Sequence, residues 1–322
     1  MRYQTIEKIF PALGTLNSVT IRCPENQAEN SAKILRDVRT MVLQLDDQLS
    51  LYKESAELSA VNRSSGIRFC SVSSDTYRIF KASSAFSEIT DGAFDITAGG
   101  LSLLWKKSLR ENRIPGFFER MTARRRTGFR NLLFSEDAAA SSFRVFLKKP
   151  GMIADLGGIA KGYAADRAKE LIQGAGITEA IINFGGTVLT IGSEQEIGIQ
   201  NPYFSRNSGI NTIGKLKVRN QAVVTSSSSE QSRSIRGREY HHIIDPRTGC
   251  PSASGLRSVT LVGDNAMELD ALATGCFVLG IEKSLSILQS RKTGGIFISE
   301  NGAVLLTENL KSHFQICASA AA

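Results

Sequence analysis

The sequence predicts an α+β fold, with a mainly antiparallel sheet core flanked by helices. Amphipathic helical segments alternate irregularly with short, strand-like apolar runs, and no internal repeat recurs at a fixed period. The dipeptide Asn301-Gly302 lies between the apolar runs 296–298 and 304–306. Because Asn-Gly tolerates positive φ, it favours a tight hairpin and therefore antiparallel pairing. We expect residues 1–322 to form a single unit of one or two subdomains.

The composition is that of an ordinary globular protein. The 322 residues are 42% hydrophobic and 22% charged, which allows a substantial core and excludes fibrous and disordered classes. The net charge of +8 favours anionic partners without identifying one. Five scattered cysteines, with no paired spacing, are expected to be reduced thiols.

Neither a membrane span nor a leader is predicted. The longest nearly apolar stretch, residues 271–281, is far shorter than the roughly 20 residues that a transmembrane helix needs. The first residues lack the hydrophobic stretch of a secretory leader. We therefore expect a cytoplasmic protein, with a processed periplasmic form as the alternative.

Two amphipathic helices are predicted in the first hundred residues. Val38, Val42 and Leu45 recur at helical intervals, so the first helix is expected over residues 29–50. Ser73 offers a start for the second helix, and Gly92 is placed to end it.

A basic helical segment is predicted at about 103–135. Arginines crowd this segment, and we interpret them as a solvated face, because nucleic-acid sites also need interleaved aromatic and polar groups. Nucleic-acid binding is the less favoured alternative, and we expect no nucleic-acid partner. The cluster comprises Arg120, Arg124, Arg125, Arg126 and Arg130.

Strands are predicted from short apolar or alternating runs. Residues 143–147 alternate and end before Pro150, and residues 180–184 form an apolar run stopped by two glycines. Further strand material is expected at residues 188–191, 197–199, 216–218 and 223–224. These runs supply the predicted sheet.

The helix predicted at residues 266–280 carries an acidic residue among apolar ones. Asp270 needs a cation or hydrogen-bond donors, since an unpartnered buried carboxylate is costly. Thr274 lies one turn later on the same face, so the two side chains could offer oxygen ligands to one Mg²⁺ ion. The alternative is structural: Thr274 bonds back to its helix, and Asp270 caps a neighbouring backbone turn.

Paired glycines precede another predicted helix. After Asp155, the residues Gly157 and Gly158 lead to Lys161. Glycines let the backbone approach an anion, and helix-start amides with a lysine suit phosphate. The spacing matches neither a P-loop nor a dinucleotide fingerprint. The alternative is a tight turn with a solvated lysine.

Two further segments contain candidate functional residues. In residues 239–249, His242 could exchange a proton near neutral pH, although a lone histidine is more often structural. In the loop 90–97, Phe94 could flank a flat heterocycle, together with Tyr52 after the first helix. Both aromatic residues could instead belong to the core.

These segments, in this order, closely resemble the ApbE-type FAD:protein FMN transferases, a flavin transferase family. The resemblance spans nearly the whole chain and includes further motifs at residues 12–15, 182–186, 222–226 and 270–274. It implies an ApbE-like flavin transferase fold and a Mg²⁺-dependent enzyme. The reaction would transfer FMN from FAD to a threonine hydroxyl of an acceptor flavoprotein subunit through a phosphoester link, releasing AMP.

The resemblance also implies roles for individual residues. Metal ligation would come from Asp270 and Thr274, with backbone oxygens of Gly158 and Ala273. The implied FAD contacts are Leu13, Tyr52, Ala93, Phe94, Asp95, Asp155, Lys161 and Ile244. Either His242 or Asp270 would accept the threonine proton, and we favour His242 slightly because a metal-bound carboxylate is a weaker base.

The chain departs from the family pattern in three places. Leu13 stands where methionine is usual, Ser227 stands where glycine is usual, and the usual leader with a lipidated cysteine is not expected from the first residues. Ser227 would alter a loop if its position required positive φ. The alternative function is a FAD-binding protein, or a Mg²⁺-dependent FAD pyrophosphatase that yields FMN and AMP without a protein acceptor.

Overall fold

An eight-stranded antiparallel sheet forms the centre of the protein. The computed structural model describes residues 2–137, 139–203, 211–230 and 232–317. Every neighbouring pair in the sheet is antiparallel, which confirms the predicted α+β class. In spatial order the strands are β1 (Tyr3–Ala12), β2 (Thr15–Pro24), β6 (Ala180–Phe184), β7 (Thr187–Ile191), β10 (Ala222–Ser227), β15 (Leu256–Gly263), β16 (Gly294–Ser299) and β17 (Val304–Leu306).

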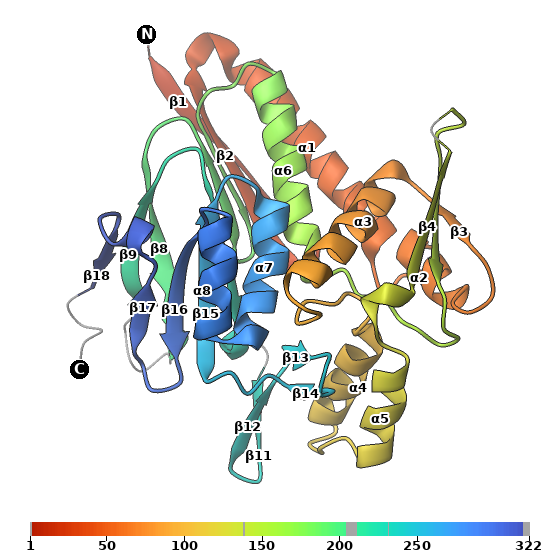
Figure 1. The fold of residues 1–322 in the computed structure, drawn as a ribbon. Coiled ribbons are helices and arrows are strands. Elements are labelled where there is room, and N and C mark those ends of the chain that lie inside the picture. The colour runs from red at the N-terminus through yellow and green to blue at the C-terminus, as the bar shows by residue number, and fades with distance from the viewer. Residues whose placement is uncertain (1, 138, 204–210, 231, 318–322) are drawn as a thin grey trace.

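Both faces of this sheet are covered. Four helices pack on one face, and Figure 1 shows them over the sheet: α1 (Ala28–Leu49), α6 (Ala160–Gly174), α7 (Ala266–Leu279) and α8 (Ile281–Ser290). On the other face lies a three-stranded sheet of β18 (Phe314–Ile316), β9 (Thr212–Val218) and β8 (Gln195–Gln200).

Strand periodicity explains the two layers. Successive side chains point to opposite faces of a strand. In β16, Phe297 joins the core under the helices, whereas Ile296 and Ile298 join the core under the small sheet. In β10, Val224 joins the core under the helices, and Val223 joins the core under the small sheet. Strands β10 and β16 therefore each contribute to two hydrophobic cores.

Smaller elements extend from the central layers. The sheet β3 (Cys70–Val72), β5 (Ser142–Leu147) and β4 (Leu132–Asp137) packs with α2 (Glu57–Arg63) and α3 (Ser74–Ile89). Helices α4 (Gly99–Arg110) and α5 (Phe117–Arg125) contact each other. Two hairpins pair β11 (Ser232–Ile235) with β12 (Arg238–His241) and β13 (Ile244–Asp245) with β14 (Cys250–Pro251). Short 3₁₀ turns are η1 (Glu25–Gln27), η2 (Phe129–Asn131), η3 (Ser228–Glu230) and η4 (Glu308–Leu310).

The predicted helices are present. The helix expected at residues 29–50 spans Ala28–Leu49, and α3 begins after Ser73, whose hydroxyl accepts a hydrogen bond from the Thr76 amide. The basic segment at 103–135 is not one helix, because α4 and α5 are separate helices and β4 follows them. The five cysteines are free thiols, as expected. No helix in the described part of the chain is both long and apolar enough to cross a membrane.

Candidate functional site

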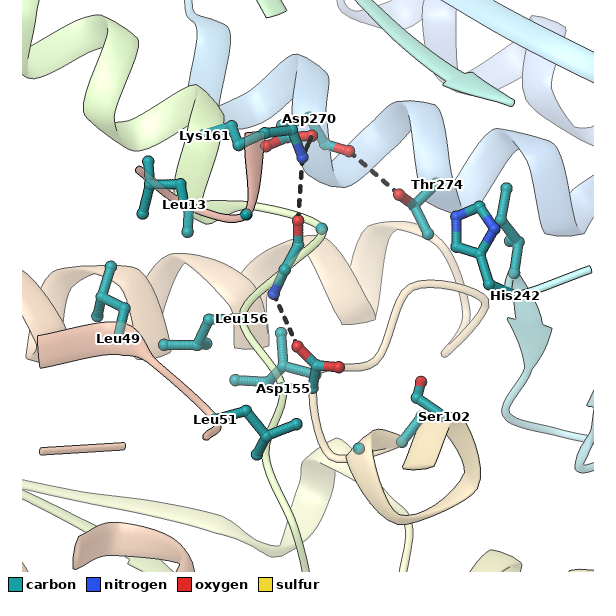
Figure 2. A pocket seen from close by; sticks show the side chains of 18 of the residues that line it. Leu13, Leu49, Leu51, Ser102, Asp155, Leu156, Lys161, His242, Asp270 and Thr274 are labelled. Carbon is teal, nitrogen blue, oxygen red and sulfur yellow. Dashed lines mark hydrogen bonds and ion pairs between the residues drawn. The ribbon is translucent and has the colours of Figure 1, made fainter. Parts of the chain in front are cut away.

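A cavity of about 670 Å³ lies where the helices of the central layer meet the connecting loops. Its lining comes from segments that are far apart in the chain, and Figure 2 labels ten of these residues. Of the candidate catalytic, FAD-binding and metal-binding residues named from the sequence, all but Ala273 line this cavity. They are Leu13, Tyr52, Ala93, Phe94, Asp95, Asp155, Gly158, Lys161, His242, Ile244, Asp270 and Thr274.

The helical wall of the cavity consists of Lys161 on α6 with Asp270 and Thr274 on α7. Asp270 is 3% exposed, and its Oδ2 accepts a 2.9 Å hydrogen bond from the Gly162 amide in the first turn of α6. The Thr274 hydroxyl lies 3.4 Å from the Asp270 carbonyl oxygen and 3.2 Å from Ser226 Oγ. Both side chains thus make the structural hydrogen bonds considered as the alternative to metal binding, with Thr274 bonding back to its helix and Asp270 capping a neighbouring turn. Both also line the cavity.

Close packing holds the two wall helices together. A Cβ on Gly162 would lie 2.2 Å from the Ala266 carbonyl oxygen, so only glycine permits this approach. The Asp166 carboxylate accepts hydrogen bonds from the Ala266 and Met267 amides and so caps α7. Burial raises the pKa of Asp166, and these two hydrogen bonds oppose that shift. The position of Asp270 relative to α6 is thus fixed by backbone contacts.

The glycine turn faces the same wall. The Gly157 amide donates to Asp155 Oδ1 at 2.9 Å, and the Asp155 amide donates to the Ile96 carbonyl at 2.8 Å. Lys161 Nζ donates to the Gly157 carbonyl at 3.2 Å and lies 3.8 Å from Asp270 Oδ1 (Figure 2). The Lys161 side chain is only 23% exposed, so the solvated-lysine alternative is wrong.

The loop 90–97 forms a second side of the cavity. Phe94 is buried, and its amide donates to the Thr90 hydroxyl. Asp95 accepts hydrogen bonds from the Thr97 amide and hydroxyl and from the Phe129 amide. Burial raises the pKa of Asp95, against the effect of those donors. The carboxylate therefore holds the loop in shape beside the cavity.

The exposed rim of the cavity consists of Leu13, Asp46 and Tyr52. Leu13 and Gly14 form the turn between β1 and β2 with φ of 53° and 72°. A left-handed conformation is unfavourable for leucine, and the Leu13 amide is held by a 2.8 Å hydrogen bond to Asp46 Oδ1. Tyr52 is 67% exposed, so the core alternative is wrong for Tyr52, whereas Phe94 is buried.

The two adjacent histidines occupy different environments. His241 is buried, lies 3.1 Å from the Ser252 carbonyl through Nε2, and packs edge-on against Phe277 of α7. Burial lowers the pKa of His241, and the bond to Ser252 acts in the opposite direction. His242 lines the cavity, and Figure 2 shows its imidazole on the Thr274 side. His241 therefore has a structural role, and His242 is the histidine at the cavity.

The donor chemistry of the helical wall fits Mg²⁺. One carboxylate from Asp270, one hydroxyl from Thr274 and nearby backbone oxygens form a set of hard ligands, which Mg²⁺ uses together with substrate phosphates. A Cβ on Gly158 would lie 3.3 Å from Thr274 Oγ1, so the Gly158 backbone is adjacent to this set. Ala273 is fully buried within α7 and does not line the cavity. Within the described residues there is no cluster of three His, Cys, Asp or Glu side chains suited to a metal.

Ser227 stands where the family usually has glycine, but its position does not require a positive φ. It ends β10, pairs with Ser258 across the sheet, and is not among the described residues with positive φ. Its hydroxyl bonds to Ser229 and to the Arg257 carbonyl. Serine is therefore accommodated without strain.

Several lining residues were not predicted from the sequence. Gly185 has φ of 51° and approaches Thr15 so closely that a Cβ would lie 2.3 Å from its hydroxyl. Ser102 and Lys106 line the cavity from α4. Their spacing from Gly99, three and seven residues, is the signal of a shared helical face that could have identified them.

Comparisons with known proteins identify the family of this chain. Residues 13–297 match the ApbE family. An FAD:protein FMN transferase from Treponema pallidum is 31% identical over 291 residues, covering 86% of this chain and 79% of the relative. One from Klebsiella pneumoniae is 30% identical over 275 residues, covering 85% and 84%. The crystal structure of the ApbE protein from Thermotoga maritima superimposes with a TM-score of 0.84 and 32% identity, covering 96% of this chain and 99% of that one. This chain therefore belongs to the ApbE family.

Proposed function

We propose that this chain transfers FMN from FAD to a threonine hydroxyl of an acceptor protein and releases AMP. The observation that carries the proposal is the single cavity shared by the helical wall, the glycine turn and His242. The relatives named FAD:protein FMN transferase support the same reaction.

FAD would occupy this cavity along its whole length. Leu13 and Tyr52 offer apolar surface at the rim, and Phe94 with Ile244 offers it inside, which suits flat rings. Ala93, Asp95 and Asp155 line the walls between them, and the glycine turn with Lys161 suits the diphosphate. Eight residues would thus contact the dinucleotide: Leu13, Tyr52, Ala93, Phe94, Asp95, Asp155, Lys161 and Ile244.

Asp270 and Thr274 would hold a Mg²⁺ ion, together with the backbone oxygen of Gly158. The Ala273 side chain is buried away from the cavity, so Ala273 would contribute only through its backbone oxygen, next to Thr274. When bound, the ion supplies positive charge that stabilises the transferred phosphoryl group and the departing AMP. Lys161 adds a second positive charge, 3.8 Å from Asp270. The Gly162 amide fixes the orientation of the Asp270 carboxylate.

In the proposed reaction, the threonine oxygen attacks the FMN-side phosphorus of FAD. A new phosphorus–oxygen bond forms, and the bond from that phosphorus to the bridging oxygen breaks. AMP leaves with the bridging oxygen and its electron pair. His242 accepts the threonine proton, and we favour it over Asp270, whose carboxylate would already be holding the metal.

The test is mass spectrometry of a threonine-bearing candidate acceptor incubated with the protein, FAD and Mg²⁺. A gain equal to one FMN group, with equimolar AMP, is the expected result. Release of free FMN and AMP with no adduct would favour the pyrophosphatase instead. Unchanged FAD with every acceptor would contradict both reactions.

If His242 is the base, His242→Ala should bind FAD and metal normally but transfer FMN slowly. Unchanged transfer in that variant would remove His242 from the mechanism. His241→Gln is the matched control, because His241 faces the core and contacts Phe277.

A further inference from the structure

Helix α4 presents one face to the cavity. Gly99, Ser102 and Lys106 are spaced by three and four residues, so they share a helical face, and all three line the cavity. The adjacent flank of the helix carries Leu101, Trp105 and Leu109, which are buried in a separate hydrophobic cluster. Burial of that flank anchors α4, with Lys106 on the side that lines the cavity.

Contacts at the start and in the middle of α4 fix its rotation. A Cβ on Gly99 would lie 2.7 Å from the Ile153 carbonyl oxygen, so the helix start is pressed against the segment that leads to the glycine turn. Farther along, the Trp105 indole donates a 2.9 Å hydrogen bond to the Gly249 carbonyl and stacks on Tyr240. Lys106, the next residue, is thereby held on the cavity side.

The other basic groups near the cavity already have partners. Lys161 bonds to the Gly157 carbonyl and lies beside Asp270. Lys53, at the rim, pairs with Asp46 at 2.6 Å and with Asp47 at 2.7 Å. Lys106 has no salt-bridge or hydrogen-bond partner within the described residues, although it is only partly exposed.

The acidic groups of the cavity are likewise engaged. Asp46 accepts from Leu13 and Lys53, Asp95 from Thr97, and Asp155 from Gly157. A diphosphate entering this cavity brings negative charge into a space that four carboxylates already line. An unpaired ammonium on the facing helix would offset that charge.

We propose that Lys106 binds a phosphate oxygen of the FAD diphosphate and of the released AMP. This proposal rests on the proposed function. It assigns to α4 a phosphate contact separate from the glycine turn, so that cations from two walls of the cavity would hold the diphosphate.

The test compares Lys106→Ala and Lys106→Gln with Lys107→Ala, using FAD and AMP as the probes. Lys107 is the matched control, because it lies next in the chain, is 70% exposed and sits 3.9 Å from Glu111. Loss of a charge-assisted hydrogen bond should weaken the binding of both nucleotides about tenfold or more in the Lys106 variants. Lys107→Ala should stay within about twofold of the wild type.

Salt dependence gives a second measurement. Added chloride should weaken FAD binding to the wild type and to Lys107→Ala more steeply than to Lys106→Gln, and Lys106→Arg should restore most of the affinity. If Lys106→Ala bound FAD and AMP as tightly as Lys107→Ala does, the inference would be overturned. If Lys106→Ala slowed only transfer to an acceptor, the inference would also be wrong, and Lys106 would contact the acceptor. A wild-type protein that bound neither nucleotide would overturn the proposed function as well.

Discussion

The helical wall and the exposed rim of the cavity are built in opposite ways. Asp270 in the wall is 3% exposed and receives a backbone hydrogen bond from a neighbouring helix, whereas Tyr52 at the rim is 67% exposed. The wall is fixed by close packing, and the rim is open to water. Under the proposed function, the wall would carry the geometry-sensitive chemistry, and the rim would mainly add binding energy.

The largest expected effect is on Asp270. Asp270→Ala and Asp270→Asn should both lower Mg²⁺-dependent FAD turnover by about 10²- to 10³-fold, because each removes the carboxylate proposed to hold the metal. Only alanine should also lower the free energy of unfolding, by about 1–3 kcal/mol, since the asparagine oxygen can still accept from the Gly162 amide. AMP release with and without Mg²⁺ and urea unfolding measure the two effects. Metal-dependent turnover retained in either variant would remove Asp270 as a ligand.

The next effect concerns the packing behind the wall. Gly162→Ala places a Cβ 2.2 Å from the Ala266 carbonyl oxygen, so α6 and α7 must separate. We expect a loss of about 1–3 kcal/mol in the free energy of unfolding, with weaker metal-dependent turnover. Gly174→Ala, at the end of the same helix with nothing within 4 Å, is the control. Equal urea midpoints for the two variants would contradict the close contact.

A smaller effect is expected at the rim. Tyr52→Ala should weaken FAD binding by about five- to tenfold, since a ring face is lost, with little change in turnover at saturating FAD. Tyr52→Phe keeps the ring and should bind FAD like the wild type. Flavin fluorescence titration measures the affinity. A turnover defect that saturating FAD does not correct would place Tyr52 with the wall instead.

The smallest effect is the pH dependence contributed by His241. Burial lowers its pKa in the folded protein, so the unfolded chain takes up the proton first as pH falls through about 6.5. The free energy of unfolding should therefore decrease between about pH 7.5 and 5.5, and His241→Gln should reduce that decrease. His313→Gln, which removes an exposed histidine, is the control. Parallel pH profiles for wild type and His241→Gln would contradict this account.

Much of the fold follows from periodicity. The helical spacing of apolar residues identified α1, α3 and α7, and the Asn301-Gly302 turn identified the β16–β17 hairpin. The β1–β2 hairpin was missed, because β1 is an edge strand with a largely exposed burial pattern. Its turn also uses Leu13 at positive φ, which no turn preference would suggest.

Some residues that line the cavity could be identified from the sequence, and others could not. Asp270 and Lys161 could be identified because a buried acid and a glycine-rich helix start are unusual in local sequence. The shared cavity depends on packing between α6 and α7, which local sequence does not specify. Lys106 was missed because a lysine on an amphipathic helix looks like any solvated residue until the partners of that helix are known.

The cavity draws its lining from Leu13 in the first hairpin to Thr274 near the last helices. A chain still emerging from the ribosome therefore has no complete site until α7 has docked against α6. A proteolytic fragment that ends before α7 lacks both Asp270 and Thr274. Under the proposed function, such a fragment would lack the two side chains proposed to hold the metal and would leave FAD uncleaved.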